Sequence, residues 1–169
     1  MPLFEPHTYC SFCGARFPDA LGWPRTCPNC GNTSYRNPLP VAVVLVPVDV
    51  GLLVVRRAVA PQVGKLALPG GYINLGESWQ AASAREVCEE TGVIVDPATI
   101  RTFQVHSAPD GTVLIFGIAN PLSGAALPVF APNTEVSERT VIAAPLELAF
   151  PLHTSAAADF FAQRPNRLR

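Results

Sequence analysis

Charged residues are scarce in this sequence, and they form no long basic run. Aspartate, glutamate, lysine and arginine make up 15% of the chain, and the formal net charge at pH 7 is −1. Proteins that bind nucleic acids or membrane surfaces usually present a basic face, so the composition argues against both classes. The 49% share of hydrophobic residues is typical of a folded globular chain and argues against disorder.

An unbroken apolar run is missing as well. The most apolar stretch, VAVVLVPVDVGLLVV, is interrupted by Pro47, Asp49 and Gly51, which argues against a helix that crosses a bilayer. The first residues, MPLFEPHTYC, lack the basic and then apolar pattern of a signal peptide. We therefore expect a cytoplasmic protein without a membrane partner. Its length of 169 residues leaves room for one main domain and a small extra module.

Four of the five cysteines form two pairs with CxxC spacing, and a glycine follows each pair. Two thiolates from one tight turn can meet one ion, and the glycine can adopt the positive φ angle that such a turn needs. Two such turns predict a tetrahedral structural Zn²⁺ site with the ligands Cys10, Cys13, Cys27 and Cys30. Two disulfides or two redox pairs are the alternatives. The missing secretory signal argues against disulfides, and nothing in the pattern indicates the helix start of a redox pair.

The cysteines also suggest how the chain is divided. We expect residues 1–37 to form a zinc ribbon held together by its ion, since so short a stretch cannot build a core. Residues 38–169 would form the main domain, after a rigid, proline-rich link at 35–40. The fifth cysteine, Cys88, is expected on the buried face of a helix.

Hydrophobic patterning predicts strands and helices in the main domain. Strands are expected at 41–46, 52–56, 66–68, 100–106 and 113–119, with shorter ones at 129–130 and 140–143. Helices are expected at 78–91, which Gly92 ends, and at 154–163, which Thr154 caps, with a brief helical turn at 145–150. Strands with helices between and after them predict an α+β fold in which helices cover a mixed sheet.

Glutamates crowd into the first of these helices. Glu86, Glu89 and Glu90 lie at i, i+3 and i+4, which places their carboxylates on one helix face, where like charges repel. A hard divalent cation such as Mg²⁺ would compensate, because it prefers oxygen ligands. Arg85 can hold one carboxylate in place with a forked hydrogen bond. A solvated acidic face is the alternative, and by itself this spacing favours it.

The residues around the glutamates match the Nudix box at every fixed position. The pattern spans 23 residues and runs Gly71, five residues, Glu77, seven residues, Arg85-Glu86-Val87, one residue, Glu89-Glu90, one residue, Gly92-Val93. The sequence therefore resembles the Nudix hydrolases, and its segment YRNPLPVAVVLV resembles members that carry an N-terminal zinc ribbon. The resemblance covers nearly the whole chain, although the C-terminal third matches only loosely.

The resemblance implies an α/β/α sandwich with a mixed sheet and the Mg²⁺-dependent hydrolysis of a nucleoside diphosphate linked to another group, X. It also implies roles for the residues of the box. Glu86, Glu89 and Glu90 are expected to bind Mg²⁺ or Mn²⁺, with a backbone carbonyl of Gly71 completing the shell. Arg85 would orient Glu86, and Glu77 would support the cluster or a second ion.

A general base or an extra metal ligand often comes from a later loop in this family. Glu135 and Glu138 are the candidates, and we favour Glu135. A solvated loop glutamate is an equally good interpretation of either residue.

The substrate is harder to infer. Related NADH pyrophosphatases carry an SQPWPFP-like motif after the box, and this chain has QVHSAPDGTVLIF in that region. ADP-ribose hydrolases tend to have a proline about as far beyond the box as Pro109, although turn chemistry explains that proline as well. We expect ADP-ribose or FAD as the substrate, with NADH or NAD as the alternative. Tyr72, Trp79 and Phe103 are candidates for stacking an adenine, although such a residue is more often part of a core.

A function of another class also fits the sequence. The fold would then sense a nucleotide without cleaving it, while the ribbon contacts RNA or a protein. The intact box argues against such a module, and the nearly neutral ribbon argues against RNA. A homodimer is expected only because Nudix hydrolases are often dimers.

Overall fold

The computed structural model describes residues 7–19 and 21–163. The chain folds as two compact units that separate between Pro38 and Leu39. Among the described residues, no helix is long and apolar enough to cross a membrane.

The N-terminal unit is built around the two cysteine turns. Strands β1 (Arg25–Thr26) and β2 (Thr33–Ser34) pair antiparallel beside them. Gly14 and Gly31 adopt positive φ angles of 72° and 73°, as the CxxC-glycine pattern predicts. The buried side chain of Phe17 packs with Cys10 and Cys27. The hydrophobic contribution to this unit is therefore small.

The second unit contains a mixed four-stranded sheet. Its strand order is β7 (Gly70–Tyr72), β3 (Leu39–Leu45), β9 (Thr112–Ile118) and β8 (Arg101–Ser107). Strands β3 and β9 run parallel, and the other neighbours are antiparallel. The box therefore begins on an edge strand of this sheet.

An antiparallel sheet lies beside the first one. It consists of β10 (Val136–Ile142), β5 (Gly51–Arg57) and β4 (Pro47–Val48), with β6 (Leu66–Ala67) also paired to β5. Two short 3₁₀ helices, η1 (Pro97–Thr99) and η2 (Gly124–Ala126), lie in the connections. In chain order β5 is followed by β6 and then by β7, so the chain passes from the second sheet directly into the strand where the box begins.

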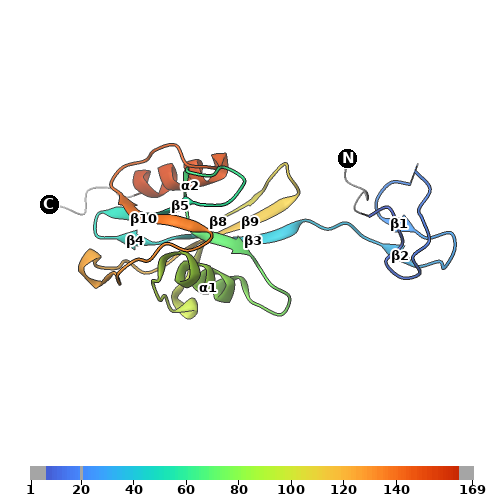
Figure 1. Cartoon of the computed structure of the whole chain (residues 1–169), viewed down its shortest axis with the longest axis horizontal. Coiled ribbons are helices and arrows are strands. Elements are labelled where there is room, and N and C mark those ends of the chain that lie inside the picture. Colours follow the sequence, from blue (N-terminus) through green and yellow to red (C-terminus); the bar gives the residue numbers. More distant parts are fainter. Residues whose placement is uncertain (1–6, 20, 164–169) are drawn as a thin grey trace. The chain divides into compact units, whose positions relative to one another are not determined.

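Two helices cover the sheets from opposite sides (Figure 1). Helix α1 (Trp79–Thr91) buries Val87 against Val44, Leu53 and their neighbours. Helix α2 (Pro151–Ala162) buries Phe160 in a second cluster on the other face. This arrangement confirms the predicted α/β/α sandwich with a mixed sheet.

The caps of α1 explain why the box positions its glutamates so well. The Ser78 side chain accepts a hydrogen bond from the Ala81 N–H at 3.1 Å, and Gly92 ends the helix with a φ of 73°. Both caps are local, so the sequence fixes where the helix begins and ends. The predicted helix over 78–91 is confirmed.

The C-terminal third differs most from the expectations. Helix α2 begins at Pro151 rather than Thr154, because proline favours the first helical turn. The Thr154 hydroxyl lies inside that turn and accepts from the Leu148 N–H at 2.9 Å. The last strand begins at Val136 instead of 140, since Val136 pairs with Arg57 of β5. No strand forms at 129–130 and no helical turn at 145–150.

Cys88 is exposed, so the prediction that it lies on the buried helix face is wrong. The buried positions of α1 are Ala82, Ser83, Glu86, Val87, Glu90 and Thr91. This stripe passes through Glu86 and Glu90 and leaves Glu89 and Cys88 on the solvent side.

Candidate functional site

The four paired cysteines converge on one point. Their sulfur atoms all lie within 4.8 Å of one another, with 3.8 Å between Cys10 and Cys30 and 3.7 Å between Cys13 and Cys27. A tetrahedral zinc ion bound at about 2.3 Å requires sulfur–sulfur separations of about 3.8 Å. All four thiols are free of disulfides. The donor set and its spacing therefore fit a zinc ion.

The four thiols differ in how easily they ionise. The backbone N–H of Ala15 and then the amide of Asn29 lower the pKa of Cys13 to about 6. Hydrogen bonds from backbone N–H groups also act on Cys27, but burial and the neighbouring thiols outweigh them and raise its pKa to about 11. Only a thiolate binds a metal ion well, so metal binding at this cluster should release protons.

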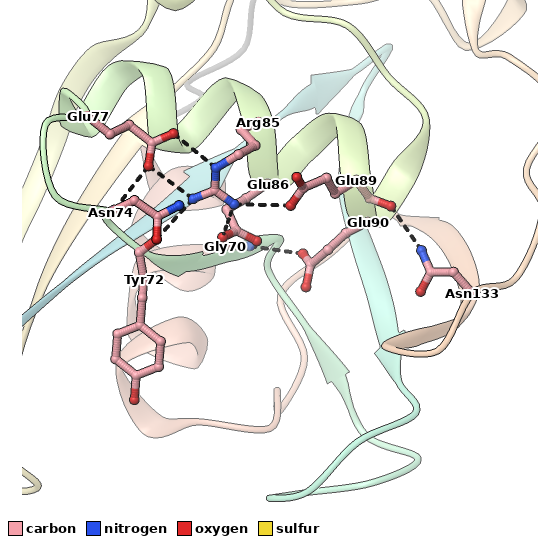
Figure 2. Close-up of polar contacts among 9 residues, drawn as sticks. All are labelled: Gly70, Tyr72, Asn74, Glu77, Arg85, Glu86, Glu89, Glu90 and Asn133. Carbon is pink, nitrogen blue, oxygen red and sulfur yellow. Dashed lines mark hydrogen bonds and ion pairs between the residues drawn. The ribbon is translucent and has the colours of Figure 1, made fainter.

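Arg85 organises the second cluster, at the box (Figure 2). Its guanidinium binds both carboxylate oxygens of Glu77, at 2.9 and 3.1 Å. It also donates to the carboxylates of Glu86 at 2.7 Å and Glu89 at 3.0 Å, and to the carbonyl of Tyr72 at 3.0 Å. These bonds use every N–H that an arginine has. The planar guanidinium of Arg85 therefore ties the loop before α1 to the glutamates on α1.

Glu77 is the main partner of Arg85 in this set of hydrogen bonds, which we call the Arg85 clamp. The hydrogen bonds from Arg85, and then the N–H of Asn74, hold its pKa below the ordinary value. The ion pair correspondingly raises the pKa of Arg85, with Glu77 as the main cause. Glu77 is thus an ionised partner of Arg85 in this structure, and its role toward a metal ion stays a prediction.

Glu86 and Glu90 are buried carboxyl groups, with exposed fractions of 8% and 7%. Burial raises the pKa of both, and for Glu90 the value reaches about 8. The N–H of Gly70 donates to Glu90 at 3.0 Å, and Arg85 partly counteracts the rise at Glu86. The charges of Glu89 and Glu135 further raise the pKa of Glu86, and those of Glu86 and Glu135 further raise the pKa of Glu90. The positive charge near the pair compensates it only in part, and a divalent cation would supply the rest.

The glycines before the helix allow an unusually close approach. A Cβ atom on Gly71 would collide with the carboxylate of Glu86, and one on Gly70 would collide with the backbone of Ala42 and Val43. Only glycine therefore lets the β7 backbone lie directly against the buried carboxyl group. Hard oxygen donors beside a close backbone are a set that Mg²⁺ or Mn²⁺ prefers.

The three box glutamates are not gathered around one point, however. In the described part of the chain, the cysteines are the only group of three or more such ligands within 4.8 Å of one another. Figure 2 shows the Glu89 side chain turned toward Arg85, while the Glu90 side chain is turned toward Gly70. Glu86 and Glu90 are thus the buried part of the cluster, and Glu89 is its exposed part.

The structure separates the two later glutamates. The charge of Glu135 raises the pKa of Glu86 and Glu90, so Glu135 lies on the side of the buried pair. Glu138 instead pairs with Arg56 across the second sheet at 2.6 Å. Of the two candidates, Glu135 is the one that the fold brings near the box.

Sequence reasoning missed two residues at this site. Asn133 bonds both to helix α1 and to the segment that carries Glu135. Arg57 lowers the pKa of Glu90 slightly and binds the carbonyls of the β5–β6 loop. The asparagine two residues before a glutamate is a turn signal that the sequence did contain.

The three aromatic candidates occupy different places. Trp79 and Phe103 pack against the two core clusters. Tyr72 is 59% exposed, and its carbonyl is bound by Arg85. Tyr72 is therefore the candidate whose ring remains accessible beside the box.

Comparisons with known proteins agree with this geometry. The model of the NUDIX domain family matches residues 37–163. The NAD-capped RNA hydrolase NudC of Shigella flexneri is 28% identical over 115 residues, which cover 68% of this chain and 44% of that protein. The chain thus spans less than half the length of the curated relatives that it matches.

Solved structures extend the likeness to most of the chain. A NUDIX hydrolase from Nitrosomonas europaea has a TM-score of 0.77 at 27% identity, over 93% of this chain and 92% of that one. A bifunctional NMN adenylyltransferase/ADP ribose pyrophosphatase from Francisella tularensis has a TM-score of 0.55 at 24% identity, over 64% of this chain and 34% of that one. The second likeness concerns the fold alone.

Proposed function

The chain belongs to the NUDIX domain family, and on this premise we propose that it hydrolyses the diphosphate linkage of a nucleoside diphosphate joined to another group. The observation that carries the proposal is the buried carboxyl pair Glu86 and Glu90, held beside the Arg85 clamp. A diphosphate is strongly negative, so these carboxylates would repel it without a cation between them. The cluster therefore fits a substrate that arrives with, or onto, a divalent metal ion.

The residues of the box have distinct roles in this proposal. Glu86, Glu89, Glu90 and the backbone carbonyl of Gly71 would hold Mg²⁺ or Mn²⁺. A bound cation of this kind acidifies water and stabilises the charge of an in-line displacement at phosphorus. Arg85 orients Glu86, with which it forms a hydrogen bond of 2.7 Å. Glu77 keeps Arg85 in place by binding it through both oxygens.

Glu135 is the residue that we assign to the attacking water. It lies on the side of Glu86 and Glu90 and is exposed, so it can exchange a proton with solvent. A base in this position would accept the proton of the water as the oxygen attacks phosphorus. Glu138 is committed to Arg56 and is the weaker candidate.

Cys10, Cys13, Cys27 and Cys30 would hold a structural Zn²⁺. Four protein ligands leave no open position on a tetrahedral ion, so this site would support folding rather than catalysis. We further propose a cytoplasmic location, a small nucleotide rather than RNA as the partner, and a homodimer.

We propose ADP-ribose or FAD as the substrate, with AMP as one product. Tyr72 would stack the adenine, because its ring is exposed beside the clamp. NADH or NAD is the second candidate, and the likeness to NudC of Shigella flexneri favours it. The absence of an SQPWPFP-like segment from QVHSAPDGTVLIF argues against that candidate.

The test is a substrate panel with Mg²⁺ or Mn²⁺, resolved by chromatography. It contains ADP-ribose, FAD, NADH, NAD⁺, diadenosine polyphosphates and nucleoside triphosphates. We expect AMP from ADP-ribose or FAD, and a loss of about 100-fold or more in Glu86→Gln, since the variant lacks a metal-binding charge. Glu147→Gln, at an exposed position far along the chain from the box, is the matched control.

Each other outcome has a definite meaning. Cleavage of NADH or NAD⁺ in preference to ADP-ribose would establish the second candidate. Nucleotide binding without cleavage of any panel member would contradict the enzyme and favour a sensing module.

A further inference from the structure

One amide side chain joins helix α1 to the loop that carries Glu135. The Nδ2 group of Asn133 donates to the backbone carbonyl of Glu89 at 2.9 Å. Its Oδ1 accepts from the N–H groups of Glu135 at 2.9 Å and Val136 at 2.8 Å. Figure 2 shows this side chain reaching the end of the helix that bears the box glutamates. The contact bridges 44 residues of sequence.

The backbone of Glu135 is held from both sides. Asn133 binds its N–H, and the N–H of Ala58 donates to its carbonyl at 2.7 Å. Ala58 follows β5, so this second bond fixes the loop to the sheet. The bond from Asn133 to Glu89 then fixes the loop to the helix. The position of Glu135 relative to the buried carboxyl pair therefore depends on Asn133.

We propose that Asn133 is a positioning residue: by bonding both to the backbone of Glu135 and to helix α1, it fixes where Glu135 stands relative to the helix that carries Glu86 and Glu90. The inference rests on the proposed function, because Glu135 is the residue assigned there to the attacking water. A shift of about 1 Å in such a group can lower a rate by about 100-fold. Asn133 makes no contribution to the chemistry itself.

The requirement for an amide is specific. An amide both donates and accepts, and Asn133 does both in this structure. Aspartate can still accept from the N–H groups of Glu135 and Val136, but it places a carboxylate oxygen against the carbonyl of Glu89. Asn133→Asp therefore keeps the turn, removes the link to the helix and adds one negative charge at that point. Asn133→Ala removes both.

The first experiment is a double-mutant cycle with Mn²⁺ binding as the readout. Mn²⁺ is titrated into the full chain and into Asn133→Ala, Glu135→Gln and the double variant, and free Mn²⁺ is measured by electron paramagnetic resonance. Glu135→Gln should weaken binding about threefold to tenfold, because it removes a charge that faces the buried pair. Asn133→Ala should weaken it to a similar degree, with no further loss in the double variant. Asn120→Ala, at an exposed loop asparagine, is the matched control.

The second experiment measures steady-state kinetics of the same variants on the substrate that the wild type cleaves. Asn133→Asp and Asn133→Ala should lower kcat roughly 10- to 100-fold with little change in KM. Neither should lower it further in the Glu135→Gln background. Asn133→Asp loses the bond to Glu89 but keeps the bonds to Glu135 and Val136. The proposal can therefore still be tested with this variant if Asn133→Ala fails to fold.

Two results would overturn the proposal. One is a double variant in which the free-energy losses of Mn²⁺ binding from Asn133→Ala and from Glu135→Gln add in full. Asn133 would then act independently of Glu135. The other is a Glu135→Gln variant that binds Mn²⁺ and turns over like the wild type. A wild type that cleaves nothing contradicts the proposed function alone, because the Mn²⁺ cycle still decides the role of Asn133.

Discussion

Replacing Glu90 by glutamine should stabilise the metal-free protein, by an amount that grows with pH. The carboxyl group is 7% exposed, and burial raises its pKa from 4.5 to about 8. Glutamine has nearly the same shape, and its amide oxygen can still accept from the Gly70 N–H. The substitution therefore removes the ionisable group while keeping its hydrogen bond.

The direction of this pH dependence follows from the protonation of Glu90 in the folded and unfolded chains. In the unfolded chain Glu90 loses its proton above about pH 4.5, whereas the folded chain keeps it until about pH 8. Stability is therefore lost as the pH rises between these two values, and the loss levels off above the folded pKa. The full difference corresponds to at most about 5 kcal/mol, and about 3 kcal/mol of it is reached at pH 7.

The assay is thermal unfolding of wild type and Glu90→Gln in buffer depleted of Mg²⁺ and Mn²⁺. About 3 kcal/mol corresponds to a rise in Tm of roughly 6–12 °C for a chain of this size. The difference in Tm between the two proteins should be smallest near pH 4.5 and should reach its plateau above about pH 8. Glu147→Gln, at an exposed site, should show no such trend.

In the presence of Mn²⁺, the wild type should become more stable than Glu90→Gln. A cation that binds only the folded state stabilises it by an amount that grows with the logarithm of its affinity, and the wild type offers the stronger site. If the gap between wild type and Glu90→Gln is the same at every pH, the carboxyl group is not buried as described and the reasoning fails.

Three further predictions concern the clamp, the ribbon and the exposed aromatic ring. Arg85→Lys should lower kcat about 100-fold in the substrate assay, because an ammonium group cannot replace the planar fork that binds Glu77 and Glu86; unchanged turnover would contradict the clamp. Cys13→Ser should abolish the bound zinc detected by mass spectrometry of the native protein; one zinc ion per chain in the variant would refute the four-cysteine site. Tyr72→Ala should raise KM for the adenine-containing substrate about tenfold with little change in kcat, and Tyr72→Phe, which keeps the ring, serves as the control; equal kinetics in Tyr72→Ala would exclude stacking.

Local patterns predicted the parts of the site that local geometry controls. The ends of α1 follow from Ser78 and Gly92, and the stop at Gly92 is as expected. The two cysteine turns follow from CxxC-glycine spacing, which the positive φ angles of Gly14 and Gly31 confirm. In each case the deciding contacts lie within a few residues, so no knowledge of the fold is needed.

Predictions were weaker where distant segments decide the structure. The last strand begins at Val136 because β5 offers it a partner, and the sequence near 136 does not reveal that pairing. Cys88 is exposed because the buried stripe of α1 runs through Glu86 and Glu90 instead. The stripe includes two carboxyl groups, which a hydrophobic pattern does not anticipate.

The sequence by itself determined the family resemblance, the spacing of the glutamates on one helix and the cysteine turns, because helix and turn geometry depend on near neighbours. Only the tertiary structure decided that Glu90 is buried with a raised pKa, that the charge of Glu135 acts on the buried pair while Glu138 pairs with Arg56, and that Asn133 reaches Glu89. These features arise where β7, α1 and the segment before β10 meet. Burial and long-range hydrogen bonds, which no local pattern encodes, set their chemistry.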